Sequence, residues 1–264
     1  MRILLTGPTG FVGARIMDAL PVIPAPSLRG MEESQVRQMV GELEPDVIIH
    51  TAALSDIGQC REMPDESYHA NVELPLWLVR TGVRTVIFSS DQVYSGLPEP
   101  GPYTERQAKP ANLYAEHKLE MEQRTLDAAP ETVLLRAAWM YDMPRYGCRN
   151  RGNFLVNMLR QEEIAFSSTQ LRSVTYVREV AAKMEKVLHL PGGVYNFGSE
   201  NTLSMLDTAR WLAETLRLRI RIRDAGPRHD LAMDTGKLKS FGLSFSSVQE
   251  GLMQCIRDYS LMEG

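Results

Sequence analysis

The stretch MRILLTGPTGFVGARIMDAL, residues 1–20, decides the fold class of this chain. An apolar strand at residues 3–5 runs directly into Gly7, Gly10 and Gly13 and then into an amphipathic helix. Glycines let the backbone approach a pyrophosphate, and the N–H groups and positive end of the following helix favour an anion. The pattern could also be a simple tight turn, but its place directly after an N-terminal strand favours a dinucleotide site.

Apolar strands and helices then alternate along the chain. A helix that ends at Pro45 precedes a buried strand at 47–49, and residues 85–90 form the next strand. This alternation predicts an α/β fold, a Rossmann-type doubly wound parallel sheet with its function at the carboxyl ends of the strands. We expect residues 1–150 to form mainly the NAD(P)-binding domain. Residues 151–264 are expected to form mainly a small C-terminal substrate-binding lobe, with segments that cross back to the core.

A tyrosine and a lysine stand four residues apart in NLYAEHKLEME, residues 112–122, and therefore share one face of a predicted helix. The Lys118 ammonium would favour the ionised form of Tyr114, so the pair could move a proton at a substrate oxygen near neutral pH. The same spacing also occurs on ordinary solvated helices. The glycine turn at the start of the chain favours the catalytic interpretation.

Two polar residues, Ser90 and Asp91, follow the strand that precedes this helix. The Ser90 hydroxyl could hydrogen-bond a substrate carbonyl, and the Asp91 carboxylate could orient a sugar hydroxyl or take part in proton transfer. The two residues could instead begin a turn or cap a helix. Their position before the Tyr114 and Lys118 pair favours a catalytic role.

The segment after the first helix departs from the usual dinucleotide pattern. Its prolines, at 21, 24 and 26, allow at most a short strand, and no acidic residue stands between Asp18 and Glu32 to hold ribose hydroxyls. Arg29 is available there instead. It could meet a 2′-phosphate and favour NADP over NAD, or it could be a solvated loop arginine. We predict NADPH as the preferred cofactor, with NAD possible.

The glycine turn and the Tyr/Lys pair resemble the extended short-chain dehydrogenase/reductase superfamily, whose glycine pattern is TGxxGxxG. Five further segments look, in sequence order, like the dTDP-4-dehydrorhamnose reductase family: SSDQVYSG, PYTERQAKPANLYAEHK, VLLRAAWMYD, GNFLVNMLR and LAMDTGKLKSFGL. The resemblance covers nearly the whole chain. Several positions depart from the family pattern: His50, Ser90 in place of threonine, Gln92 in place of tyrosine, Ala115 and His117. The family's D-Q-x-G-x-P-T segment is changed to TQLRSVT at residues 169–175.

The resemblance implies reduction of the C4 keto group of a nucleotide-linked 6-deoxysugar. Tyr114 would protonate the keto oxygen, while Lys118 would hold the cofactor ribose and lower the pKa of the tyrosine. The implied cofactor contacts are Gly7, Thr9, Gly10, Phe11, Val12, Gly13, Arg29, Ala52, Ala53, Tyr114 and Lys118. The implied substrate contacts are Ser90, Asp91, Arg136, Trp139, Asn153, Arg172 and Arg228. Judged by residue type alone, Trp139 could simply pack, Arg136 could form a salt bridge, and the other two arginines could be solvated.

Two other functions fit the same residues: an NAD-dependent sugar-nucleotide epimerase or dehydratase, and a non-catalytic NAD(P)-binding regulatory subunit. The net charge of −4 argues against nucleic acid or an anionic membrane as the main partner, so we expect a nucleotide sugar. No signal peptide or spanning helix is visible, and the three separated cysteines indicate free thiols in the cytoplasm. The five histidines lack the spacing of metal ligands, and we expect no metal. The chain would act as a monomer or homodimer.

Overall fold

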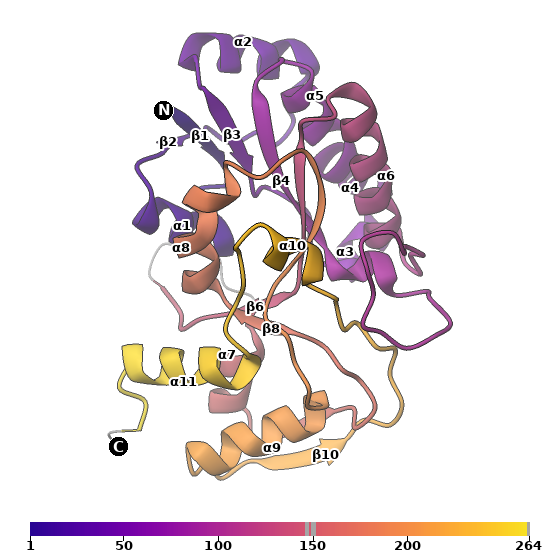
Figure 1. Cartoon of the computed structure of the whole chain (residues 1–264), viewed down its shortest axis with the longest axis vertical. Helices are drawn as coiled ribbons and strands as arrows, with labels where there is room; N and C mark the ends of the chain where they lie inside the picture. Colours follow the sequence, from indigo (N-terminus) through magenta and orange to yellow (C-terminus); the bar gives the residue numbers. More distant parts are fainter. Residues whose placement is uncertain (146–147, 149–151, 263–264) are drawn as a thin grey trace.

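A six-stranded parallel sheet forms the centre of the computed structural model, which describes residues 1–145, 148 and 152–262 (Figure 1). In spatial order its strands are β2 (Ile23–Pro24), β1 (Ile3–Thr6), β3 (Val47–His50), β4 (Arg84–Ser90), β5 (Val133–Ala137) and β9 (Gly193–Phe197). The chain passes from β1 outward to β2 and then crosses to β3, so the strand order reverses between β1 and β3. Ligands bind at such a switch point in open α/β sheets. The predicted fold class is confirmed.

Helices cover both faces of this sheet, which is why its strands read as continuous apolar runs. One face carries α1 (Phe11–Ala19) and α8 (Val177–Val187), whose Ile16 and Met184 share a core with Leu5 of β1. The opposite face carries α2 (Glu33–Leu43), α5 (Leu74–Val79) and α6 (Leu113–Ala128). There Val36 and Leu78 pack with Leu4, the neighbour of Leu5, because successive side chains of a strand point to opposite faces.

Four short elements pack against α6. They are α3 (Ile57–Glu62), α4 (Pro64–Tyr68), the π-helical turn η1 (His69–Glu73) and the 3₁₀ turn η2 (Asp91–Tyr94). The turn η2 begins directly after β4, so the chain reverses at the carboxyl end of that strand. Residues at the start of η2 therefore lie at the edge where the switch point predicts a ligand.

A second group of elements lies below the sheet in Figure 1 and has its own core. It contains two parallel strand pairs, β6 (Trp139–Tyr141) with β8 (Val174–Tyr176) and β7 (Glu163–Phe166) with β10 (Arg221–Asp224), which pack against helices. These helices are α7 (Phe154–Arg160), α9 (Met205–Thr215) and α11 (Val248–Asp258), while α10 (Gly236–Ser240) lies against β9. Phe154, Tyr176, Leu212 and Leu252 are buried together in this core. We call this group the C-terminal lobe.

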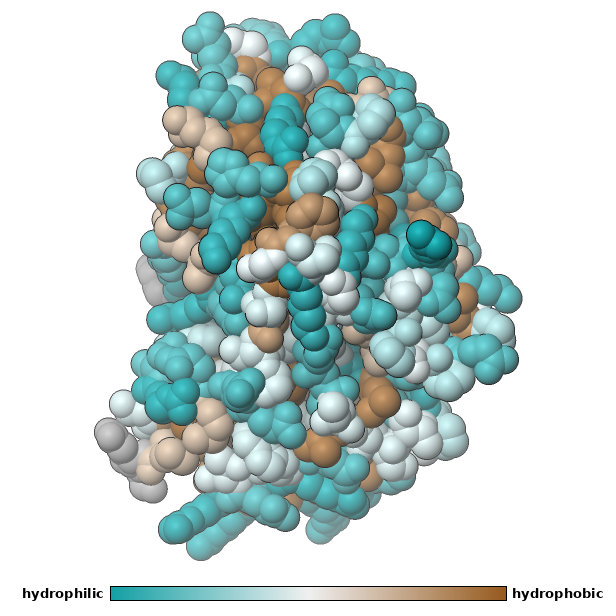
Figure 2. Space-filling view, viewed as in Figure 1, coloured by the Kyte–Doolittle hydropathy of each residue, from teal (hydrophilic) through white to brown (hydrophobic). Residues whose placement is uncertain are grey.

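Hydrophilic side chains cover most of the face drawn in Figure 2, including its lower end at β10. Within the described residues, no helix combines the length and the apolar character needed to cross a bilayer. The same residues contain no group of three or more histidine, cysteine or acidic side chains arranged to hold a metal ion.

Candidate active site

The glycine turn joins β1 to α1 at the switch point. Gly7 has a φ of +69°, and a Cβ there would lie 2.9 Å from the Ala52 nitrogen. A Cβ on Gly13 would lie 2.1 Å from the Gly7 carbonyl oxygen, so both positions require glycine for the turn to pack this closely. Gly10 is the N-cap of α1 and offers no side-chain cap, so the first N–H groups of the helix are left for an anion.

Other residues predicted to contact the cofactor surround this turn. Thr9 lies in the turn, Phe11 and Val12 lie at the start of α1, and Ala52 and Ala53 lie in the loop after β3. All five residues are half-buried or exposed. Arg29 follows β2, where its guanidinium donates to the Glu66 carboxylate at 3.0 Å and its side chain is 79% exposed. A contact of Arg29 with a 2′-phosphate stays a prediction, and Glu66 would compete for the cation.

The Tyr114 and Lys118 side chains are both buried on the first turns of α6. Asn112 fixes the start of this helix because its side chain accepts a hydrogen bond from the Ala115 N–H at 3.0 Å. The Lys118 Nζ donates to the Phe88 carbonyl oxygen of β4 at 3.0 Å and lies 5.9 Å from the centre of the Tyr114 ring. Burial lowers the pKa of Lys118 to about 8, against the opposing influence of Glu122.

The Tyr114 phenol lies near the Ser90 hydroxyl and the Asp91 carboxylate. The Ser90 hydroxyl donates to the Asp91 Oδ1 at 3.2 Å, and Ser90 and Asp91 both influence the pKa of the Tyr114 phenol. The Ser90 oxygen also accepts the Gln92 N–H at 3.2 Å, so this serine does begin the turn η2. Serine and tyrosine therefore meet at the carboxyl end of β4, where a carbonyl oxygen could contact both hydroxyls.

The expected lowering of the Tyr114 pKa is not what the structure shows. Burial raises the pKa of Tyr114, and the nearby Ser90 hydroxyl and the charge of Arg172 oppose that rise. The Lys118 ammonium donates to the Phe88 carbonyl, and Lys118 is not among the causes that shift the pKa of Tyr114. The tyrosine is therefore protonated at neutral pH, the state that a proton donor requires.

A guanidinium from the C-terminal lobe completes the group. Arg172, in the segment before β8, donates to Asp91 through Nε at 2.9 Å and through Nη2 at 3.3 Å. Its Cζ lies 5.4 Å from the centre of the Trp139 ring, within reach of a cation–π contact. The segment that departs most from the family pattern thus places a cation beside Ser90 and Asp91.

Arg136 is not placed to contact a substrate. Its side chain is 3% exposed, and its Nη2 lies 2.6 Å from the Glu122 carboxylate. The same guanidinium bonds the Tyr94 hydroxyl and the backbone carbonyls of Glu105 and Gln107. The predicted substrate role of Arg136 is therefore corrected to a buried ion pair, because its donors are used within the protein.

Asn153 is likewise used by the fold. It is the N-cap of α7, where its Oδ1 accepts the Val156 N–H at 3.1 Å and its Nδ2 donates to the Asp142 carbonyl at 2.7 Å. Both ends of this buried amide are satisfied, which argues against a substrate contact. Arg228 is exposed beyond β10, and an anion contact there stays a prediction.

Two residues of the site carried weaker signals in the sequence. His50, at the end of β3, is 1% exposed and bonds the Thr6 hydroxyl through Nδ1 at 2.8 Å, while its Nε2 has no partner among the described residues. Burial, reinforced by the charge of Lys118, lowers the pKa of His50 to about 3, so the ring is neutral. Glu122 is the second such residue: it stands four residues after Lys118 on α6 and pairs with Arg136. Its spacing from Tyr114 and Lys118 could have indicated that it lies on the same helix face.

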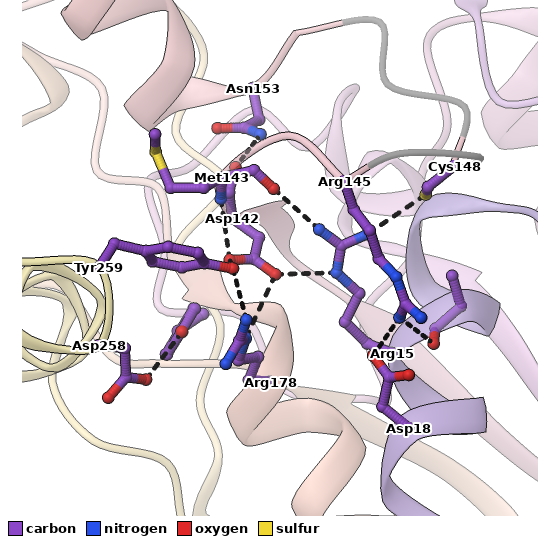
Figure 3. A network of polar contacts seen from close by, with 12 residues as sticks. Arg15, Asp18, Asp142, Met143, Arg145, Cys148, Asn153, Arg178, Asp258 and Tyr259 are labelled. Carbon is purple, nitrogen blue, oxygen red and sulfur yellow. Dashed lines mark hydrogen bonds and ion pairs between the residues drawn. The ribbon is translucent and has the colours of Figure 1, made fainter.

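Figure 3 shows a polar network that ties α1 to the C-terminal lobe. Arg15 of α1 is 4% exposed, and its Nε donates to the Asp142 carboxylate at 2.8 Å. Asp142 also accepts the Tyr259 hydroxyl at 2.8 Å and lies 3.7 Å from Arg178 of α8. The outer part of the network, where Arg145 pairs with Asp18, is exposed. The position of α1 therefore depends on residues more than a hundred positions away.

Known proteins resemble this chain over most of its length. The family model described as the RmlD substrate binding domain matches residues 1–252. The spore coat polysaccharide biosynthesis protein SpsK of Bacillus subtilis is 24% identical over 229 residues, which cover 81% of this chain and 78% of that protein. The dTDP-4-dehydrorhamnose reductase of Aggregatibacter actinomycetemcomitans is 25% identical over 232 residues, covering 79% and 76%.

Solved structures share the fold over almost the full length. The dTDP-4-dehydrorhamnose reductase of Bacillus anthracis in complex with NADP has a TM-score of 0.86 at 23% identity, covering 97% of this chain and 99% of that chain. The UDP-glucose 4-epimerase of Thermotoga maritima with UDP-glucose has a TM-score of 0.81 at 21% identity, covering 98% and 100%. The resemblance that the sequence motifs indicate is confirmed by the family match.

Proposed function

The chain belongs to the RmlD substrate binding domain family of extended short-chain dehydrogenases/reductases, and we propose that it uses NADPH to reduce the C4 keto group of a nucleotide-linked 6-deoxysugar. One observation carries the proposal: the Tyr114 phenol and the Ser90 hydroxyl meet at the carboxyl end of β4, with the Lys118 ammonium buried beside them. A hydroxyl pair of this kind can polarise a carbonyl and protonate it.

The residues around the glycine turn fit a nicotinamide dinucleotide. The turn and the uncapped start of α1 suit a pyrophosphate, as argued above. Within the described residues the Lys118 ammonium donates one hydrogen bond, although it is 2% exposed and has three N–H groups. The two remaining donors suit ribose hydroxyls, because a buried charge is stable only when its hydrogen bonds are made. When bound, the reduced cofactor supplies the hydride to the carbonyl carbon.

The protein's part in the reaction is to place the carbonyl and to supply a proton. The keto oxygen would accept hydrogen bonds from Ser90 and Tyr114, which polarises the carbonyl toward the incoming hydride. As the carbon gains the hydride, the phenol proton of Tyr114 passes to the oxygen and leaves a phenolate. The positive charges of Lys118 and Arg172 favour that phenolate, and a proton from solvent restores the phenol.

Single-turnover reduction of a nucleotide-linked 4-keto-6-deoxysugar, followed by NADPH absorbance, tests this function. Replacing Tyr114 with phenylalanine keeps the packed ring but removes the proton, so the chemical step should slow by roughly 10²–10⁴ while NADPH affinity stays nearly unchanged. Tyr195→Phe is the matched control, since the hydroxyl of this buried β9 tyrosine donates to the Pro191 carbonyl and should not affect turnover. Wild-type protein that binds NADPH but turns over no such sugar would favour a regulatory subunit. A Tyr114→Phe variant with the wild-type rate would require another proton donor.

A further inference from the structure

We propose that Arg172 is a positioning residue for the reaction, because its two-point ion pair holds the Asp91 carboxylate and leaves the Ser90 hydroxyl available to the substrate carbonyl. The inference rests on the function proposed above and adds a residue to it. In the family pattern D-Q-x-G-x-P-T, position 172 corresponds to the glycine. A glycine supplies no charge, so this ion pair is a feature of the present chain and not of that pattern.

The backbone around Arg172 is held in place, which makes the position of its side chain reproducible. Its carbonyl oxygen accepts a hydrogen bond from the Asn201 side chain at 3.1 Å. The adjacent Leu171 carbonyl accepts the Leu231 N–H at 2.9 Å, within an isolated β-bridge between residues 172 and 231. Arg172 therefore projects from an anchored segment of the C-terminal lobe toward Asp91 at the end of the sheet.

Two contacts fix the plane of the guanidinium. Asp91 is 2% exposed and receives both Nε and Nη2, while Arg172 is 21% exposed and lies over the Trp139 ring. Trp139 is itself held edge-on against Phe154, with ring centres 6.2 Å apart. A planar guanidinium can donate two hydrogen bonds to a carboxylate and stack on an aromatic ring at the same time, whereas a lysine ammonium acts as a point charge.

The hydrogen-bond lengths show how Asp91 is shared. Arg172 binds Asp91 at 2.9 Å, whereas the Ser90 hydroxyl reaches it at 3.2 Å, which is long for a bond between a hydroxyl and an oxygen. A carboxylate that already receives a guanidinium holds the serine hydroxyl weakly. Ser90 can then turn its hydrogen to an arriving carbonyl at little cost. Without Arg172, the uncompensated carboxylate would retain the hydroxyl.

Arg172 also balances charge around the proton donor. Four titratable side chains face Tyr114: Asp91 from η2, Cys60 from α3, Lys118 from the same helix α6, and Arg172 from the C-terminal lobe. Asp91 raises the pKa of Tyr114 and Arg172 lowers it, so the pair acts on the phenol with opposite signs. Removal of Arg172 leaves the negative charge of Asp91 unopposed and disfavours the phenolate that forms when Tyr114 gives up its proton.

The test compares Arg172→Met, Arg172→Lys, Asp91→Asn and the double variant Asp91→Asn/Arg172→Met. Steady-state reduction of the keto-sugar gives kcat and KM. Ultraviolet difference titration of the NADP-bound protein, with the Tyr114→Phe signal subtracted, gives the pKa of the phenol without turnover. Arg172→Met should lower kcat roughly tenfold to a hundredfold with a smaller change in KM, and should raise the pKa of Tyr114. Arg172→Lys should recover part of both effects.

The double variant removes both charges, so the pKa of its Tyr114 should lie closer to the wild-type value than that of Arg172→Met. A general folding defect would not produce this recovery. Arg210→Met is the matched control, since that arginine pairs with Asp207 on the surface of α9 and should change neither measurement. An unchanged titration and an unchanged kcat in Arg172→Met overturn the inference, as does a loss confined to KM, which would make Arg172 a substrate-binding cation. If the titration shifts as expected but wild type reduces no keto-sugar, the ion pair stands and the proposed reaction is wrong.

Discussion

Breaking the Arg15–Asp142 ion pair should destabilise the protein far more than breaking an exposed pair on the same helix. In Arg15→Met the buried Asp142 carboxylate loses a donor at 2.8 Å, and the Met143 carbonyl loses one at 2.9 Å. A hydrogen bond to a charged group contributes roughly 1.5–3 kcal/mol and a neutral one about 1 kcal/mol. Asp142 keeps the Tyr259 hydroxyl and the more distant Arg178, which places the expected loss near the lower end of the roughly 3–5 kcal/mol range for a broken buried pair.

Urea unfolding of the purified variants measures this loss as a change in the free energy of unfolding. Asp18→Asn is the control, because it removes the exposed pair between Asp18 and Arg145 and should cost less than about 1 kcal/mol. The double variant Arg15→Met/Asp142→Asn should lose less stability than the sum of its single variants, since no charge is left unpaired. An Arg15→Met variant no less stable than Asp18→Asn would refute the assignment of this network as a structural tie for α1.

Three further predictions concern the cofactor. Burial lowers the pKa of Lys118 to about 8, so its ammonium is charged below that pH and neutral above it. The NADPH affinity of the wild type, measured by fluorescence titration, should therefore fall by up to about tenfold per pH unit above pH 8. The Lys118→Met variant should show no such pH dependence. Gly10→Val should fold normally by circular dichroism yet lose NADPH, because a Cβ there meets only the Gly7 carbonyl at 3.1 Å while the side chain blocks the pyrophosphate; normal binding would make the turn purely structural. Arg29→Ala should weaken NADPH by ~1–3 kcal/mol and leave NADH nearly unchanged, whereas an equal loss for both would remove Arg29 from the 2′-phosphate.

Features of the site that depend only on residues close together in the sequence could be predicted from the sequence. The glycine turn after β1 follows from three glycines at fixed spacing, and Tyr114 and Lys118 share a face because residues four apart do so on any helix. Strand alternation and the rule for switch points then indicated which edge of the sheet carries Ser90 and Asp91. These inferences needed only local geometry and the period of the hydrophobic pattern.

Only the tertiary structure decided which charged groups meet. Arg172 and Arg136 are both arginines near family motifs, yet one pairs with Asp91 in the site and the other is buried against Glu122. The pKa of Tyr114 depends in the same way on burial and on a cation from another lobe, so its direction could not be obtained from the Tyr/Lys spacing. Ion pairs and desolvation are set by groups that the fold brings together from distant parts of the chain, and no local pattern encodes those distances.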